Sequence, residues 1–311
     1  SKYFKPTLNN FDLIRLLAAL QVVVVHVCEH FNLEKNLFVR ILDYFPGVPV
    51  FFFISGLLIV RSHERQGCLK NFYRNRLLRI YPGLWACFFV SCVFVALFYK
   101  FDCSIIDFVK WAACQLSFVQ FYNPDFLRGF GIGVLNGSLW TIPIELQFYI
   151  LTPAVIVLKK RKMLIVSFLL FVGLNFGYQA YKTDAMIWKL LMVSFLPWFC
   201  YFLAGALAYS NFDKIIPLVR GKFFIWLGIY ALTVLGAGFL KLQAVGNDIN
   251  LLVAAVLLFL SMSFALSFDG LSHKLLKGND ISYGVYIYHM LVVNAFIHNK
   301  FMQNYWGLWA V

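Results

Sequence analysis

The feature that most constrains this chain is the repetition of apolar runs long enough to cross a lipid bilayer. A crossing helix needs about 20 predominantly apolar residues, and residues 10–31 already supply one such run. Over the 311 residues, 61% are hydrophobic and only 13% are charged. A soluble domain is about 45–50% apolar and about 25% charged. We therefore predict an all-α polytopic membrane protein, with a single domain over residues 1–311.

The hydrophobic pattern predicts about ten transmembrane helices. The residues from about 305 predict the start of the tenth, which we expect to continue past Val311. The segment 104–122 is also apolar, but Asp107 and Lys110 lie within it, and we expect it to be interfacial or re-entrant. The nine complete predicted spans cover residues 10–31, 46–62, 81–100, 140–158, 163–180, 190–209, 222–240, 249–268 and 282–300.

Basic residues between the spans predict the orientation. The stretch 61–80 carries six Lys and Arg residues, and "KKRK" follows at 159–162. Cytoplasmic loops are enriched in Lys and Arg. Both stretches lie on the cytoplasmic side only if an even number of spans separates them, and therefore only if 104–122 does not cross the membrane. The amino terminus is then also cytoplasmic. We attribute the net charge of +13 to this topology and not to nucleic-acid binding.

The first predicted span contains several ionisable residues, among them Arg15 and His26. Arg15 and His26 are eleven residues apart, about 20° from three full helical turns, so they share a face and lie about 16 Å apart along the axis. Ionisable residues inside a bilayer are rare and usually functional, and imidazole suits proton transfer near neutral pH. Two plainer explanations remain open: Arg15 snorkels to the headgroups, and a neighbouring helix satisfies His26.

Glu145 is a second buried ionisable residue, five residues inside the predicted span 140–158. A depth count at 1.5 Å per residue puts Glu145 and His26 at the same level of the bilayer. We therefore expect the two side chains to meet in one pocket, where the carboxylate would orient the imidazole. A purely structural pair that joins two helices fits the same geometry.

Arg76 and Arg79 precede the third predicted span and are three residues apart, so both project from one side of a helix. Their guanidinium groups suit phosphate oxygens, although ordinary positive-inside charge also explains them.

Small and aromatic residues interrupt two other spans. Ser55–Gly56 predicts a close helix approach or a kink. A nucleophilic Ser55 is a weaker hypothesis, because no GxSxG motif surrounds it. In "ISYGVYIYH" the tyrosines fit an interfacial aromatic belt, whereas His289 lies deeper and is harder to explain in that way.

The order of five motifs resembles the type-3 family of integral-membrane acyltransferases. The motifs are "FDLIRLLAALQVVVVH", "GVPVFFFISGLLI", "FYRNRLLRIYP", "GSLWTIPIELQFYI" and "ISYGVYIYH", and the resemblance covers essentially the whole chain. One departure is Pro49, because members often carry an acidic residue at that place. The residue roles implied are catalytic for His26 and Glu145, donor-binding for Arg15, Arg76 and Arg79, and substrate-binding or supporting for Ser138, Trp140, Ser282, Tyr283 and His289. From its place in the second span, we also expect Ser55 to be substrate-binding or supporting.

The resemblance implies an O-acyltransferase of the bacterial cytoplasmic (inner) membrane. Acetyl-CoA would be the acyl donor, and a saccharide or lipid-linked glycan, such as a lipopolysaccharide precursor, would be the acceptor. Membrane lipids are the other expected partners, no metal is expected, and no motif indicates an oligomeric state. The alternative is a polytopic transporter or flippase with a polar site near the midplane, which would consume no acetyl-CoA.

Overall fold

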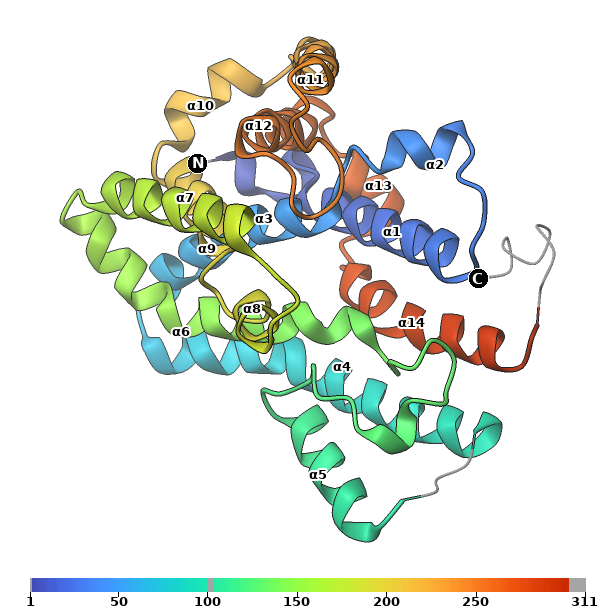
Figure 1. Cartoon of the computed structure of the whole chain (residues 1–311). Helices are drawn as coiled ribbons and strands as arrows, with labels where there is room; N and C mark the ends of the chain where they lie inside the picture. The colour runs from blue at the N-terminus through green and yellow to red at the C-terminus, as the bar shows by residue number, and fades with distance from the viewer. Residues whose placement is uncertain (1, 100–102, 302–311) are drawn as a thin grey trace.

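The computed structural model describes residues 2–99 and 103–301, and within them every regular element is a helix, which confirms the all-α prediction. The first and last long helices, α1 and α14, lie side by side (Figure 1). The α-helices are α1 (Phe11–His30), α2 (Leu37–Leu42), α3 (Gly47–Gln66), α4 (Leu69–Phe98), α5 (Ile105–Leu116), α6 (Thr141–Lys160), α7 (Leu164–Tyr181), α8 (Met186–Met192), α9 (Phe199–Ser210), α10 (Phe212–Val219), α11 (Phe223–Phe239), α12 (Leu251–Ser267), α13 (Leu271–Leu276) and α14 (Ser282–His298), and the short 3-10 helices are η1 (Lys2–Phe4), η2 (Pro6–Leu8), η3 (Asp125–Leu127) and η4 (Gly137–Trp140).

The count of ten crossings is not confirmed. Five helical stretches of the described residues are long and apolar enough to cross a membrane, or six if α10 and α11, which meet at 85°, form one bent span. Helices α9 and α12 are apolar but shorter. The segment 104–122 forms α5, whose 12 residues are too few to cross. The predicted tenth span, from about 305, lies outside the described residues.

The predicted span 190–209 is broken into α8 and α9. Pro197 lies in the break and disfavours helical backbone at the residue before it. The Gln147 side chain of α6 provides hydrogen-bond partners for backbone groups in this break. Its amide donates to the Val193 carbonyl at 3.2 Å and accepts from the Phe195 N–H at 2.8 Å. Backbone groups in a membrane need such internal partners, which explains why a polar Gln147 lies in an apolar helix.

Helices α3 and α9 cross at the centre of the bundle through a reciprocal pair of glycines. A Cβ atom added to Gly56 would lie 2.0 Å from the Phe202 carbonyl oxygen, and one added to Gly205 would lie 2.0 Å from that of Phe53. Small residues allow this approach between membrane helices. Helix α3 runs through Gly56 without interruption, so the close approach predicted from Ser55–Gly56 is confirmed and the kink is not needed.

We expect Gly56→Ala to lower the thermal stability of the protein, because its methyl group would collide with the α9 backbone. Overpacking of this kind costs about 1–3 kcal/mol. The midpoint can be measured by fluorescence-detected size exclusion after heating in detergent. The matched control is Gly173→Ala in α7, where an added Cβ meets no atom within 4 Å. Equal midpoints for the two variants would contradict this account of the crossing.

The segment between α5 and α6 folds back onto α14, and Asn294 holds it there. This fully buried amide accepts from the Ile132 N–H at 2.8 Å and donates to the carbonyls of Val134 and Leu135 at 3.0 and 2.9 Å. Gly131 has a φ of +56°, and a Cβ there would lie 2.0 Å from Asn294 Oδ1. This inserted loop fixes the point at which η4 and α6 begin.

Candidate functional site

Arg15 and His26 share the face of α1 that packs against α14, as their spacing predicts. Arg15 forms an ion pair with Asp280, two residues before α14 begins. His26 Nδ1 lies 3.0 Å from His289 Nε2, in the second turn of α14. The two side chains therefore mark two separate polar clusters, one at each end of the α1–α14 contact.

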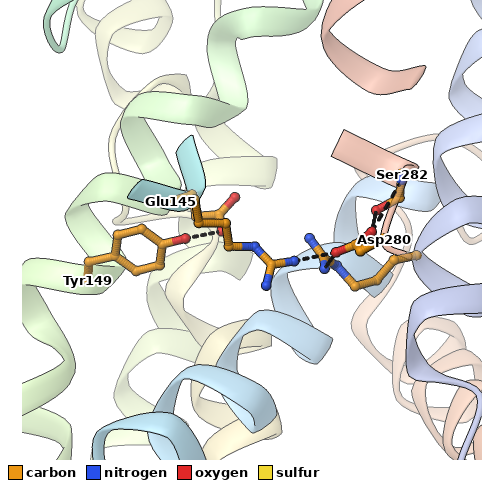
Figure 2. Close-up of polar contacts among 6 residues, drawn as sticks. Glu145, Tyr149, Asp280 and Ser282 are labelled. Atoms are coloured by element: carbon orange, nitrogen blue, oxygen red, sulfur yellow. Dashed lines mark hydrogen bonds and ion pairs between the residues drawn. The ribbon is translucent and has the colours of Figure 1, made fainter. Parts of the chain in front are cut away.

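The first cluster is centred on Asp280, which pairs with both Arg15 and Arg79. Its second carboxylate oxygen accepts from the Ser282 hydroxyl at 2.5 Å and from the Ser282 N–H at 3.2 Å, so Asp280 also satisfies the first N–H of α14. Figure 2 shows Asp280 and Ser282 on one side and Glu145 and Tyr149 on the other, with guanidinium groups between them. Both arginines are thus held in place by one acid.

Glu145 belongs to this arginine end and does not meet His26. Its carboxylate accepts a 2.5 Å hydrogen bond from Tyr149, and it lines a cavity together with Arg15 and Arg79. The expected Glu145–His26 pair is therefore wrong. The depth count failed because α6 begins deep inside the bundle. The Oγ atom of Ser138, just before α6, already lies 3.2 Å from the carbonyl oxygen of Tyr286, which is one turn into α14.

Arginines line a cavity of about 440 Å³ between α3 and α4. Arg61, Arg65, Arg76 and Arg79 contribute to its wall, and none of its lining residues is acidic. Arg76 donates to the Ser62 hydroxyl at 3.2 Å, but its buried Nε–H has no partner among the described residues, and the same holds for the buried Oε1 of Gln66. The prediction that Arg76 and Arg79 project to one side is confirmed. Unpaired cationic donors of this kind suit an anion.

Two smaller cavities continue from the arginine cavity into the bundle. The first shares Leu58, Arg76 and Arg79 with it and adds Ser55 and Glu145. The second shares Arg15, Ser55 and Glu145 with the first and ends against Thr141, Ser282, Tyr283 and Tyr286. A series of cavities therefore leads from the arginines to the residue whose carbonyl binds His289.

The second polar cluster is a pair of histidines whose hydrogen bonds indicate their tautomers. His289 Nδ1 lies 2.7 Å from the Tyr286 carbonyl oxygen. A carbonyl only accepts, so Nδ1 carries a proton and Nε2 of a neutral His289 is an acceptor. His26 Nδ1 must then donate to that Nε2. This assignment leaves His26 Nε2 with a free lone pair, the arrangement that a general base needs.

The remaining predicted residues support this architecture. Ser138 Oγ lies 2.6 Å from Asn136 Oδ1, and the Trp140 ring packs on Trp198 with centroids 5.3 Å apart. Tyr283 donates to the Ile80 carbonyl at 3.0 Å and so joins α14 to α4. Ser55 faces the two smaller cavities.

Sequence reasoning missed Asp280 and Tyr149. A usable signal for Asp280 existed, because an acid close to the start of an apolar helix interacts favourably with the unpaired N–H groups of its first turn. Tyr149 lies one helical turn after Glu145, and this i, i+4 spacing was the available indication. Within residues 2–99 and 103–301, no group of three or more His, Cys, Asp or Glu residues could hold a metal ion.

Comparisons with known proteins identify the family that this chain resembles. A family model described as "acyltransferase domain" matches residues 8–311. A relative named nodulation protein 10, from Rhizobium leguminosarum bv. viciae, is 30% identical over 97% of this chain and 87% of its own. An O-acetyl transferase of Shigella phage Sf6 is 30% identical over 96% of this chain and 88% of its own. A peptidoglycan O-acetyltransferase of Listeria monocytogenes is 25% identical over 50% of this chain and 25% of its own. No solved structure matches.

Proposed function

Because this chain belongs to the acyltransferase domain family, which includes O-acetyltransferases, we propose that it moves an acetyl group from cytosolic acetyl-CoA to a hydroxyl of a saccharide. The observation that carries the proposal is the series of cavities from the arginines towards the His26–His289 pair. An anionic donor would bind at the arginine end, and proton transfer would occur at the histidine end. Family membership disfavours the alternative of a transporter or flippase.

The donor's phosphates fit the arginine cavity. Its wall offers four guanidinium groups and no acid, and the unpaired Nε–H of Arg76 is available to a phosphate oxygen. Two cavities of about 10 and 40 Å³ continue from it into the bundle, and they would have to widen to admit the chain that ends in the thioester. Arg15 and Arg79, which both pair with Asp280, line this route. Glu145, which accepts a hydrogen bond from Tyr149, also lines it.

His26 acts as the general base in this proposal. Its Nε2 lone pair takes the proton of the acceptor hydroxyl while that oxygen bonds to the thioester carbonyl carbon. The carbon–sulfur bond then breaks, and the departing thiolate takes the proton from His26. His289 holds the tautomer of His26 through its own bond to the Tyr286 carbonyl, a role that an acid has in triads of the serine-protease type.

We assign the protein to the bacterial cytoplasmic membrane with a cytoplasmic amino terminus. The six basic residues of 61–80 support this orientation, and they bring the arginine cavity to the compartment where acetyl-CoA is made. A surface polysaccharide or its lipid-linked precursor is the proposed acceptor class.

An assay on the purified protein in lipid nanodiscs tests the proposal. We expect labelled acetyl-CoA to release free CoA, and we expect the label to appear on surface glycan extracted from the source bacterium. Mass spectrometry of the glycan should show a gain of one acetyl group that disappears when the gene is deleted. Glycan export without any acyl modification would favour a flippase and would overturn the proposal.

We expect Arg76→Gln to raise the KM for acetyl-CoA by about tenfold, the loss of one charge-assisted hydrogen bond to phosphate. Its kcat should change little, because Arg76 binds the donor away from the reacting atoms. Initial rates at varied acetyl-CoA measure both constants. The matched control is Arg74→Gln, two residues away on α4, which is exposed and does not line the arginine cavity. An unchanged KM in Arg76→Gln would contradict the assignment of this cavity to the donor.

A further inference from the structure

A second large cavity, which shares no lining residue with the three described above, lies between the inserted loop and α8. Its volume is about 850 Å³, within the range of about 300–1,000 Å³ that is usual for ligand sites, and we name it the aromatic groove. One wall comes from α5, the loop that follows it and η4. The other wall comes from the end of α7, from α8 and from the loop before α12. No acyl donor is assigned to this groove.

Aromatic rings are the most prominent feature of the groove. Trp140 packs on Trp198 with ring centroids 5.3 Å apart, and Trp188 packs on Tyr178 at 5.8 Å. Trp198 is fixed further by a 2.8 Å bond from its indole N–H to the Met192 carbonyl. Flat, immobilised rings with a negative face attract the polarised C–H groups of a ligand, and a pyranose ring presents such C–H groups on its faces.

Amide side chains supply the polar part of the groove, and one of them lacks a partner. Gln120 is 2% exposed, and its NH₂ group donates to the Ser117 carbonyl, which fixes the orientation of the amide. Its Oε1 is buried and accepts no hydrogen bond from the described residues. A buried acceptor without a donor is costly, and a hydroxyl of a bound ligand would satisfy it.

The charges of the groove favour a neutral ligand. Two lysines and two aspartates line it, and Lys182 already pairs with Asp248 across its wall. The arginine cavity, in contrast, has four arginines and no acid. A phosphorylated ligand would therefore prefer the arginine cavity, and an uncharged polyhydroxylated ligand would prefer the aromatic groove.

The groove is joined by a hydrogen bond to the segment of α14 that precedes His289. Asn136 lines the groove and donates to the Ile287 carbonyl at 2.8 Å. The Ser138 hydroxyl lies 2.6 Å from Asn136 Oδ1 and 3.2 Å from the Tyr286 carbonyl that binds His289, and its single proton is donated to one of these two acceptors at a time. One wall of the groove is thus fixed to the segment of α14 that orients the proposed base.

We infer that the aromatic groove binds a neutral segment of a saccharide chain by stacking on its tryptophans and by hydrogen bonding to its amides. The role of that saccharide as acyl acceptor rests on the proposed function, whereas its binding does not. The groove would select the chain to be modified, and the histidine pair would act on one of its hydroxyls.

The test is binding of the full-length protein in nanodiscs to an array of bacterial surface glycans, without acetyl-CoA. We expect the wild type to retain at least one neutral saccharide. Trp188→Ala should weaken that binding by about fivefold, the loss of one stacking contact, and Gln120→Leu should weaken it by a similar factor. The matched control is Trp226→Ala, a tryptophan stacked on Phe259 that does not line the groove. It should bind like the wild type.

Two outcomes would overturn the inference. In the first, a folded wild type binds no glycan. In the second, the wild type binds phospholipid headgroups, and Trp188→Ala abolishes that binding but leaves glycan binding unchanged. Acyl transfer measured on the same samples separates this inference from the proposed function. Transfer with an acceptor KM unaffected by Trp188→Ala would refute the groove alone. Glycan binding that depends on Trp188, without any transfer, would refute the proposed function alone.

Discussion

His26→Gln is expected to lower the rate of acetyl transfer by about 10²–10⁴-fold, the range that a positioned general base contributes. The KM for acetyl-CoA should remain unchanged, because the arginine cavity lies at the other end of the α1–α14 contact. Glutamine keeps a side chain that can hydrogen bond to His289 but cannot take a proton at neutral pH. Release of CoA in nanodiscs, with matched protein levels and elution volumes, measures the effect.

His289 provides the control that separates a base from a structural histidine. His289→Leu removes the acceptor of the His26 Nδ1 proton, so His26 can adopt the wrong tautomer, and we expect a loss of about 10–100-fold, as for other orienting residues. His289→Gln keeps an acceptor oxygen and should recover part of the rate. The pH profile should change in His289→Leu and return in His289→Gln. Equal rates for wild type and a correctly inserted His26→Gln would remove His26 from the mechanism.

The relation between Arg15 and His26 could be predicted from sequence because it depends only on helix geometry. Eleven residues bring the two side chains to one face of any regular helix, and α1 runs without a break from Phe11 to His30. Arg76 and Arg79 were predictable for the same reason. Within one helix, local periodicity is enough to group residues.

The partner of His26 could not be predicted in this way. The depth count assumed that α6 begins at the membrane surface. Instead, the inserted loop, which Asn294 holds against α14, places the start of α6 beside the second turn of α14. Such a loop is possible only because buried amides satisfy its backbone. Long-range contacts of this kind decide which helix ends meet, and no periodicity encodes them.

The span count is not confirmed for a related reason. Length and hydropathy identify apolar segments, but Gln147 and Asn175 allow a break inside one of them by binding the backbone around Pro197. The sequence shows these polar residues only as interruptions of apolar helices. The structure shows that these residues bind the backbone of the break before α9, which is why α9 has only 12 residues.

The Asp280 carboxylate was overlooked in the sequence, yet it holds together three parts of the donor route. It neutralises Arg15, which is 8% exposed, pairs with Arg79 and accepts from both the hydroxyl and the N–H of Ser282. Removal of one partner from a buried ion pair is far more destabilising than the pair is stabilising, because an unpaired charge remains. Here two guanidinium groups would be left facing each other.

We therefore expect Asp280→Asn to lower the free energy of unfolding by about 3 kcal/mol, while the retained amide oxygen still accepts from Ser282. The comparison variant is Asp269→Asn, whose pair with Arg220 is 44% and 37% exposed in its side chains and should be worth less than about 1 kcal/mol. Thermal midpoints of both variants in the same detergent measure the difference. The double variant Arg15→Gln/Asp280→Asn should recover part of the loss, because one unpaired charge is removed with the acid. A midpoint of Asp280→Asn equal to that of Asp269→Asn would mean that water reaches and screens Arg15 and Arg79, and it would contradict the role of Asp280 as the acid that holds them.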